Sequence, residues 1–430
     1  MVIATLFQGA PTLTLSEAID LGVQNAFSVR LAETAVEKTR NQLSAAKGSL
    51  GPSVAVNGTY TRFDKATVAQ FGSQSVVVSP IDSKQASLSL NWQVDIAGNT
   101  GRAIKAAKNL TDASEAQRDA QVNDVKERVR QAYYGVLQSI ELLDVVRQTR
   151  DANKARLANA QVQFEAGTVA RVDVLRFDTQ LAQSESDVLA AENQVRLAKQ
   201  ALNNVLGRPI ETPFDPEPVT VLPKADAAAD SYVAEALASR PEIVAQRNTL
   251  DALRFVREAE QRGLSPSLNL SAVHNRNIDA QGFSSRSSST TGTAVISWPI
   301  FDSGITRSRV HAAQRDEESA SLQLEQLKLG ISLEVRQALS NLRDAEARQV
   351  VAAKQATLAE ESYRLAQVRY DAGEGIQLEV TDALTELTRA RAGVVNARYD
   401  TLNAYAALQR AVASDAPQGG AKEQGESIGS

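Results

Sequence analysis

Cysteine is absent from the 430 residues of the chain, and aromatic side chains make up only 5% of it. The absence of cysteine excludes disulfides, thiolate metal sites, cysteine nucleophiles and a lipid-bearing N-terminal cysteine. No window of eighteen apolar residues occurs, which excludes a transmembrane helix on length, so a membrane role would need strands. With 43% apolar residues and abundant alanine, the composition favours close-packed helices over a globular interior.

A large excess of charge of either sign is also missing. The chain has 46 Lys and Arg against 51 Asp and Glu, a net charge of −5, and no basic block. Binding to a nucleic-acid backbone therefore has little electrostatic support. Residues 1–12 lack a basic segment followed by an apolar core, which predicts either a cytosolic protein or one whose signal peptide has been removed.

Residues suited to catalysis or metal binding are few. The only two histidines, His274 and His311, lie 37 positions apart in the sequence. No Gly-rich phosphate loop, nucleophile elbow or paired-acid cleft is recognisable. We therefore expect no catalytic site, no metal and no cofactor, and predict that the protein is not an enzyme.

The chain is a tandem duplication. Shifted by 206 positions it lies on itself without a gap from its first tryptophan: Trp92 falls on Trp298, Gly98 on Gly304 and Gly167 on Gly373. A constant offset fixes the length of the segments between these landmarks, as two copies packed side by side would require. The predicted parts are a first repeat, a Pro-rich linker, a second repeat and a disordered tail, at 14–206, 207–230, 231–413 and 414–430.

Each repeat is predicted to contain a helix, a β-hairpin, a long helix and a shorter helix, in this order. The strands are indicated by alternation of apolar and polar residues, and the long helices by apolar residues spaced near three and a half. The predicted ranges of the first repeat are 14–48, 53–63 with 87–96, 98–165 and 172–206. Those of the second repeat are 231–263, 267–276 with 292–300, 304–371 and 378–413. Solvent-facing loops are expected at 64–85 and 277–291.

Four strands are long enough to cross a bilayer but too few to close a barrel, whereas three chains would supply twelve. In that arrangement one face of the strand 87–96 meets lipid and the other meets water. Trp92 and Trp298 then lie near an interfacial belt. The lipid-facing residues would be Leu88, Leu90, Val94 and Ile96, and the water-facing residues Ser89, Asn91, Gln93 and Asp95. The alternative is a soluble hairpin that caps a helical bundle.

The predicted fold class is mainly α with a small β part. Duplicated long coiled-coil helices form an α-helical barrel. Two β-hairpins, with four strands per chain, complete a transmembrane β-barrel in a trimer.

Two motifs carry a resemblance to a known family. The segment Trp-Pro-Ile-Phe-Asp-Ser-Gly at 298–304 precedes the second long helix, and Arg-Tyr-Asp-Ala-Gly at 369–373 ends it. A duplicated chain with these motifs, from about residue 14 to 413, resembles the TolC family of outer-membrane efflux proteins. The segment 92–98 is a weaker version of the first motif, and no export signal is present.

The resemblance implies a homotrimeric channel in the outer membrane of a Gram-negative bacterium, extending into the periplasm. Its implied partners are a periplasmic adaptor (membrane fusion) protein, an inner-membrane transporter and outer-membrane lipid. The expected function is passive conduction of substrates from a transporter–adaptor complex, in efflux or type I secretion. The alternative from another class is a soluble coiled-coil scaffold without a pore.

The resemblance also implies a periplasmic gate. Glu379 and Asp382 match acidic residues that form a ring at the channel entrance, and Tyr370 matches a tyrosine that ties neighbouring tip helices together. Asp173 and Arg176 are its expected partners. The alternatives are that the acids complement a helix dipole, and that Tyr370 fills the coiled-coil seam.

Gly167 and Gly373 resemble the hairpin tips that dock on adaptor hairpins in this family. Their other expected role is termination of the long helices in the left-handed region.

Overall fold

The computed structural model describes residues 11–219, 227–278 and 287–413, and the chain divides into two compact units. The first unit comprises Met1–Glu33, Gln117–Ile243 and Gln326–Ser430. The second comprises Thr34–Ala116 and Val244–Glu325. Each unit draws on both halves of the sequence, so the division into units runs across the two sequence repeats. The tail predicted at 414–430 lies outside the described residues.

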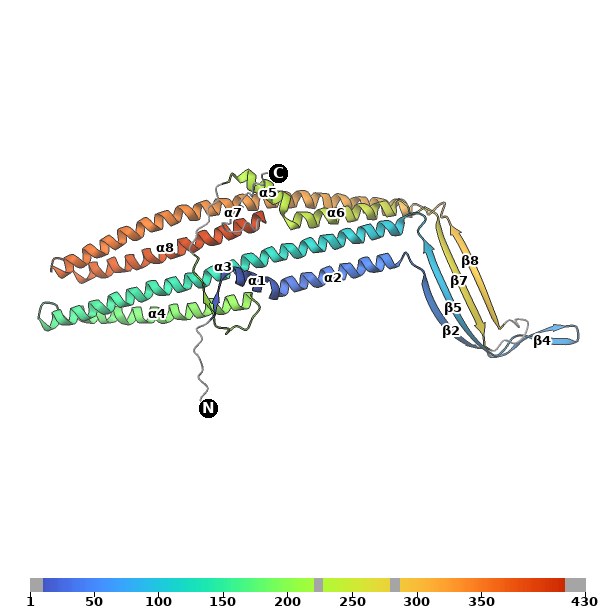
Figure 1. Cartoon of the computed structure of the whole chain (residues 1–430), viewed down its shortest axis with the longest axis horizontal. Helices are drawn as coiled ribbons and strands as arrows, with labels where there is room; N and C mark the ends of the chain where they lie inside the picture. Colours follow the sequence, from blue (N-terminus) through green and yellow to red (C-terminus); the bar gives the residue numbers. More distant parts are fainter. Residues whose placement is uncertain (1–10, 220–226, 279–286, 414–430) are drawn as a thin grey trace, which may run out of the picture. The chain divides into compact units, whose positions relative to one another are not determined.

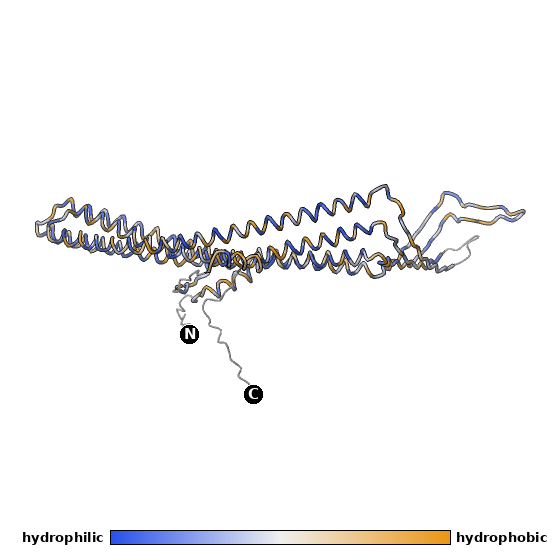
Figure 2. Tube along the Cα trace, turned by 90° about the horizontal axis from the view of Figure 1, so that it is seen from above, coloured by the Kyte–Doolittle hydropathy of each residue, from blue (hydrophilic) through white to orange (hydrophobic). Residues whose placement is uncertain are grey.

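The two long helices are α3 (Asn99–Glu165) and α7 (Ile305–Asp371), each of 67 residues. They begin one residue after the predicted starts and end at the predicted residues. The shorter helices α4 (Arg171–Val205) and α8 (Gln377–Val412) follow them. Polar and apolar residues alternate along these helices (Figure 2). In the described part of the chain, no helix has a stretch long and apolar enough to cross a membrane.

The first helix of each repeat was predicted as one piece and is in fact two. α1 (Leu15–Asn25) and α2 (Phe27–Gly48) are separated by Ala26, and α5 (Ala229–Ser239) and α6 (Pro241–Glu260) by Arg240. Ala26 and Arg240 both have extended backbone angles. Proline disfavours the α conformation in the preceding residue, which explains the break before Pro241. The sequence around Ala26 contains no such signal.

In the first unit four helices lie in the order α4, α3, α8, α7 (Figure 1). Arg147 of α3 donates a hydrogen bond to Glu192 of α4. Tyr399 of α8 donates one of 2.7 Å to Glu141 of α3. Arg391 of α8 pairs with a glutamate of α7, Glu360. α3 and α8 are therefore the central pair of this layer.

The core of the first unit lies around Tyr133 of α3, which is fully buried with neighbours from α1, α4 and α8. Its hydroxyl donates to the carbonyl oxygens of Leu13 and Glu217, at 2.8 Å each. Burial raises the pKa of Tyr133 to about 12. Leu13 is the last residue of β1 (Thr12–Leu13), and Glu217 directly follows β6 (Asp215–Pro216), the strand that pairs with β1 in parallel.

The segment predicted as a linker is thus partly built into the core. Phe214 is buried beside β6, and Lys199 of α4 donates a hydrogen bond of 2.8 Å to its carbonyl oxygen. The Pro-rich linker predicted at 207–230 is therefore not a free connection in this part, because a large aromatic side chain gains more from burial than from exposure. Residues 220–226 lie outside the described part of the chain.

The second unit contains one four-stranded antiparallel sheet in the order β2-β5-β7-β8. Its strands are β2 (Ser53–Arg62), β5 (Asp82–Val94), β7 (Ser267–Asn277) and β8 (Ser288–Ser297). β5 starts five residues before the predicted strand because Asp82 pairs with Arg62 at the far end of β2. Asp95 and Ile96 fall outside the strand, and β8 begins four residues and ends three residues before the predicted strand 292–300, contrary to prediction.

The segment 64–85 was predicted as a loop and contains a further hairpin. β3 (Thr67–Phe71) pairs with β4 (Gln74–Ser79) in a separate two-stranded sheet. The run Val76-Val77-Val78 has the β-branched composition of a strand, a signal that the abundance of Ser, Gly and Gln obscured. Residues 279–286 of the second predicted loop are not among those described.

Candidate functional site

The four-stranded sheet has one apolar and one polar face. In the register of the sheet, Val54 pairs with Leu90, and Trp92 pairs with Leu270, so these side chains share a face. The opposite face carries Ser, Asn, Thr and Gln. Its polar members include Ser53, Asn57, Thr59, Ser87, Ser89, Asn91, Gln93, Asn269, Ser271, Asn275, Ser289, Thr291 and Thr293, and Ala55, Val273 and Val295 lie on the same face. Large side chains of the apolar face are exposed, among them Val54, Val56, Leu88 and Ile296.

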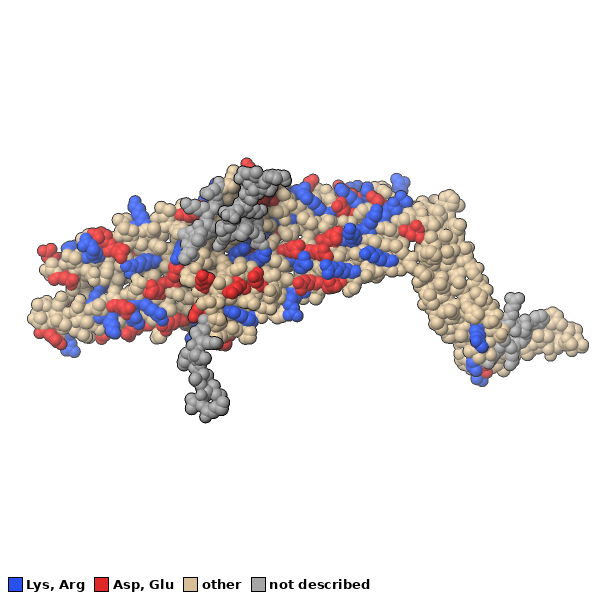
Figure 3. All heavy atoms as spheres, in the orientation of Figure 1, with Lys and Arg blue, Asp and Glu red and all other residues tan. Residues whose placement is uncertain are grey.

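Charged residues occur only at one end of this sheet. The charged residues of the four strands are Arg62, Asp82, Lys84 and Arg276. Figure 3 accordingly shows the strands almost free of charged atoms away from that end. About nine residues of each strand form an uncharged band, which at ~3.3 Å per residue spans ~30 Å, the thickness of a bilayer's hydrocarbon core.

The two tryptophans lie at the other end of the sheet. The Trp92 Nε1 donates to the carbonyl oxygen of Leu50 at 2.8 Å, and the Trp298 Nε1 to that of Leu264 at 3.1 Å. Both acceptors belong to the segments that join a helix to a strand. Each indole therefore has a structural role at a helix–strand junction, and Trp298 remains 66% and Trp92 39% exposed.

The tips of the helical hairpins are built identically. Gly167 and Gly373 have φ values of 77° and 76°, in the left-handed region. The next residues, Thr168 and Glu374, donate backbone hydrogen bonds of 2.9 Å to Gln163 and Arg369, five positions back. This is the Schellman pattern, and it turns each chain sharply into the following helix.

The two predicted gate acids lie in the first turns of α8. Glu379 forms an ion pair with Arg369, at 3.3 Å from Nη1 to Oε2. Arg369 belongs to the end of α7, so this contact stays within one helical hairpin. Asp382 is exposed and three residues further along α8. Because they are three positions apart, the two carboxylates share a side of the helix.

Tyr370, Asp173 and Arg176 line one cleft of about 800 Å³ between the two tips. The structure thus brings these three predicted residues together, but the Tyr370 hydroxyl is buried without a hydrogen-bond partner. The expectation that Asp173 or Arg176 would be its partner was wrong. The Tyr370 ring instead makes an edge contact with Phe177 of α4, with centroids 6.2 Å apart.

The environment of Tyr370 disfavours ionisation. Burial raises its pKa, and the neighbouring carboxylates of Asp173 and Asp371 raise it further. Because the neutral Tyr370 hydroxyl has no hydrogen-bond partner, it contributes little to holding the two tips together. The aromatic contact with the buried Phe177 is the more substantial link.

A second contact between the tips was missed in the sequence. The guanidinium of Arg156 in α3 lies over the ring of Tyr363 in α7, at 4.8 Å from the centroid. Arg156 is buried, and its Nε and Nη2 have no hydrogen-bond partner. Burial lowers its pKa, which the interaction with Tyr363 only partly offsets. The sequence signal that could have indicated this contact is an arginine, Arg156, at an apolar position of the coiled-coil seam.

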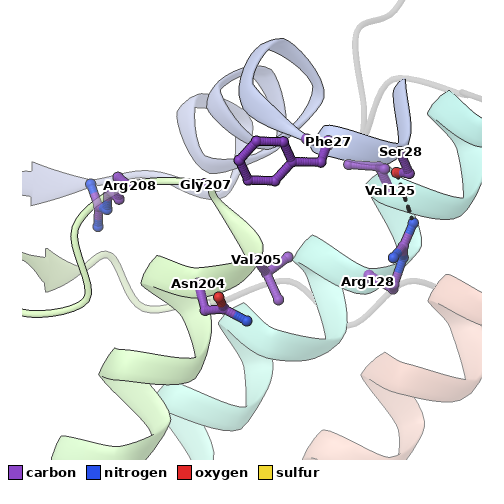
Figure 4. A pocket seen from close by; sticks show the side chains of 9 residues that line it. Phe27, Ser28, Val125, Arg128, Asn204, Val205, Gly207 and Arg208 are labelled. Atoms are coloured by element: carbon purple, nitrogen blue, oxygen red, sulfur yellow. Dashed lines mark hydrogen bonds between the residues drawn. The ribbon is translucent and has the colours of Figure 1, made fainter. Parts of the chain in front are cut away.

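A cavity of about 410 Å³ lies where α2 begins and α4 ends. Figure 4 shows Phe27 facing Asn204 and Val205 across it, with Arg128 hydrogen-bonded to Ser28 at 3.3 Å. The breaks at Ala26 and Arg240 are equivalent places of the two repeats, because α1 and α5 begin and end 214 positions apart. The second repeat therefore has an arginine where the first has alanine and an open cavity.

Comparison with known proteins identifies a family that matches most of the chain. A family model described as "Outer membrane efflux protein" matches residues 18–208 and 232–414. CyaE of Bordetella pertussis is 24% identical over 390 residues, covering 90% of this chain and 79% of that protein. The outer membrane protein TolC of Escherichia coli is 27% identical over 296 residues, covering 63% and 57%.

The fold is shared with a solved structure of the outer-membrane channel OprN, with a TM-score of 0.78 at 21% identity. The match covers 93% of this chain and 89% of that one. The predicted fold class is confirmed.

Proposed function

The chain belongs to the outer membrane efflux protein family, and from this membership we propose that three copies form one channel across the outer membrane and periplasm. The protein is located in the outer membrane, with its helices extending into the periplasm. Its function is that of an outer-membrane channel of efflux or type I secretion. The scaffold without a pore is not favoured.

The main support for the proposed trimer is the open four-stranded sheet, which has one apolar and one polar face. β2 and β8 are its edges and pair on one side only among the described residues. An unpaired edge in lipid leaves backbone groups without hydrogen bonds, so four strands need strands from other copies. The apolar face then meets lipid and the Ser- and Asn-rich face lines water, while Trp92 and Trp298 lie at the boundary.

The cleft between the tips supports a gate at the periplasmic entrance of the channel. A threefold axis would place three copies of Glu379 and of Asp382 around the entrance, and a ring of carboxylates favours cations. Opening would separate the α7–α8 hairpin from the α3–α4 hairpin. The contacts to be broken are Tyr370 with Phe177 and Arg156 with Tyr363, whereas Glu379 keeps its pair with Arg369.

The two turns at Gly167 and Gly373 are the proposed contact points for a periplasmic adaptor. Each turn lies at the end of its helical hairpin. Because the two turns have the same backbone geometry, each chain offers an adaptor two equivalent contact points. An inner-membrane transporter would supply the energy. We propose that the chain itself performs no chemistry and acts as a passive duct.

Purification in detergent, followed by mass measurement and recording in a planar bilayer, tests the proposal. We expect a particle with three times the 46.1 kDa of one chain, and stepwise conductance. A single chain that leaves cells without detergent and gives no conductance would contradict it.

A further inference from the structure

The charged side chains of the four-stranded sheet all lie on its apolar face. Leu88 pairs with Val56, and the side chains of a strand alternate between the two faces. Every second position of β5 therefore shares the face of Leu88, and Asp82 and Lys84 are such positions. The charged residues that the register places on this face are Arg62, Asp82, Lys84 and Arg276. The polar face of the four strands carries no Lys, Arg, Asp or Glu.

This placement is the reverse of what hydration alone would favour. In the proposed trimer the polar face lines water, where a charged side chain stays hydrated. The apolar face meets lipid, where a cation is costly except near the boundary of the membrane. The sheet nevertheless keeps its cations on the lipid side, so we looked for an anion on that side.

The cations lie near the outer boundary of the membrane. The strands leave the periplasmic helices at the end that carries Trp92, so the charged end of the sheet (Figure 3) is the external one. Lys84 is eight positions from Trp92, or ~26 Å along the strand, close to the ~25 Å height of the apolar band of membrane barrels. Tyr60, which pairs with Lys84 and is 58% exposed, places an aromatic ring at the same boundary.

The three cations lie on neighbouring strands at a spacing that lets one anion contact two of them. Lys84 is two residues from Asp82, which pairs with Arg62. Lys84 is also two residues from Ala86, which pairs with Arg276. Diagonal neighbours of this kind are about 7–8 Å apart, within reach of long side chains. We call Arg62, Lys84 and Arg276 the outer cation row.

The outer cation row has an excess of positive charge. Asp82 is the only carboxylate of the four strands, and it accepts a hydrogen bond of 2.7 Å from the Tyr60 hydroxyl. Arg62 Nη1 lies 3.7 Å from Asp82 Oδ1, and the two side chains are 69% and 43% exposed. One carboxylate does not neutralise three cations, so this end of the lipid-facing surface attracts anions.

We propose that the outer cation row binds the phosphate groups of a phosphorylated lipid in the outer leaflet of the membrane. Guanidinium groups contact phosphate oxygens in pairs, and a lysine adds a point charge. A lipid phosphate lies at the boundary between hydrocarbon and water, which is the level of the row, and its acyl chains would lie along exposed apolar side chains such as Val56 and Leu88. The inference rests on the proposed function, which assigns this face to lipid.

Lipid A with two phosphates is the probe, and its enzymatically dephosphorylated form is the matched control lipid. Each is titrated into the purified protein in a neutral detergent, and native mass spectrometry measures the bound lipid. The phosphorylated form should bind more tightly by about tenfold. Equal binding would show that the cations only extend into water and would overturn the proposal. Excess inorganic phosphate should not displace the lipid, and displacement would overturn a lipid as the ligand.

Lys84→Gln with Gln85→Lys is the matched variant. It moves one cation by a single position, from the lipid-facing to the water-facing side, and leaves the net charge unchanged. Binding of phosphorylated lipid A should weaken as much as in Lys84→Gln alone, and recovery of the parent affinity would show that only net charge matters. Arg62→Gln with Arg276→Gln should bring the two lipid forms closer in affinity, and an unchanged difference would remove both arginines from the site.

Mass and conductance separate this inference from the proposed function. Each variant should keep the mass and conductance of the parent, which shows that it is folded and assembled. A conducting trimer that binds both lipid forms equally overturns the outer cation row as a lipid site but leaves the channel standing. A parent protein that is monomeric and gives no conductance overturns the proposed function itself.

Discussion

Arg240 Nη1 lies 2.5 Å from Glu334 Oε2, although Arg240 is only 3% exposed and occupies the break between two helices. The same guanidinium contacts Glu242 at 2.6 Å. Arg410 of α8 pairs with Glu334 and with Asp124 of α3. Desolvation lowers the pKa of Arg240, but its bonds to Glu242 and Glu334 outweigh this effect and leave the pKa raised. This cluster ties α5, α7, α8 and α3 together in the first unit.

Arg240→Met should destabilise the first unit by about 2–4 kcal/mol, because it leaves Glu242 and Glu334 with Arg410 as their remaining cation. The control is Arg336→Ala, which removes an ion pair to Asp230 that is exposed on both sides, with an expected loss of under about 0.5 kcal/mol. Denaturant unfolding followed by circular dichroism measures both. Equal losses would show that the buried cluster has no special role.

Tyr370→Phe should leave the resting conductance nearly unchanged, because the hydroxyl that it removes has no hydrogen-bond partner. Phe177→Ala removes the edge contact with the Tyr370 ring and should raise the open fraction in bilayer recordings. If Tyr370→Phe opens the channel as much as Phe177→Ala, then the Tyr370 hydroxyl, and not the aromatic contact, holds the two hairpins together.

Glu379→Ala with Asp382→Ala should reduce the preference of the channel for cations, because it removes six carboxylates from a trimeric entrance. The reversal potential in a salt gradient is the measurement. Glu386→Ala is a suitable control, since this exposed acid of α8 lies further from the tip and pairs with Arg389. An unchanged reversal potential in the double variant would remove both acids from the proposed gate.

Gly373→Ala should lower stability by about 1–2 kcal/mol, because a side chain is strained at a φ of 76°. Gly135→Ala should do the opposite. Gly135 lies inside α3 with open space around it, so alanine raises helix propensity there by up to about 1 kcal/mol. Thermal melting of the two variants should therefore shift in opposite directions, and a shift of the same sign would contradict the assignment of strain to the turn.

The gate was only partly predictable from the sequence. Gly373 and Tyr370 lie together because the turn that joins α7 to α8 is a local feature, whereas Asp173 of α4 was expected beside Tyr370 only from the family resemblance. The contacts between the hairpins were not predicted, because Phe177 and Arg156 reach Tyr370 and Tyr363 from another hairpin, far away in the sequence. No local pattern encodes which faces of two coiled coils meet.

Val145 and Val351 mark the boundary between what the sequence determined and what tertiary structure decided. The sequence by itself determined that both are valines at the same position of two long helices, since the periodicity and the 206-residue offset are local and repetitive. Only the tertiary structure decided that Val145 is buried and Val351 exposed. Burial depends on whether another helix covers the residue, and in one chain α8 covers α3 while nothing described covers that side of α7.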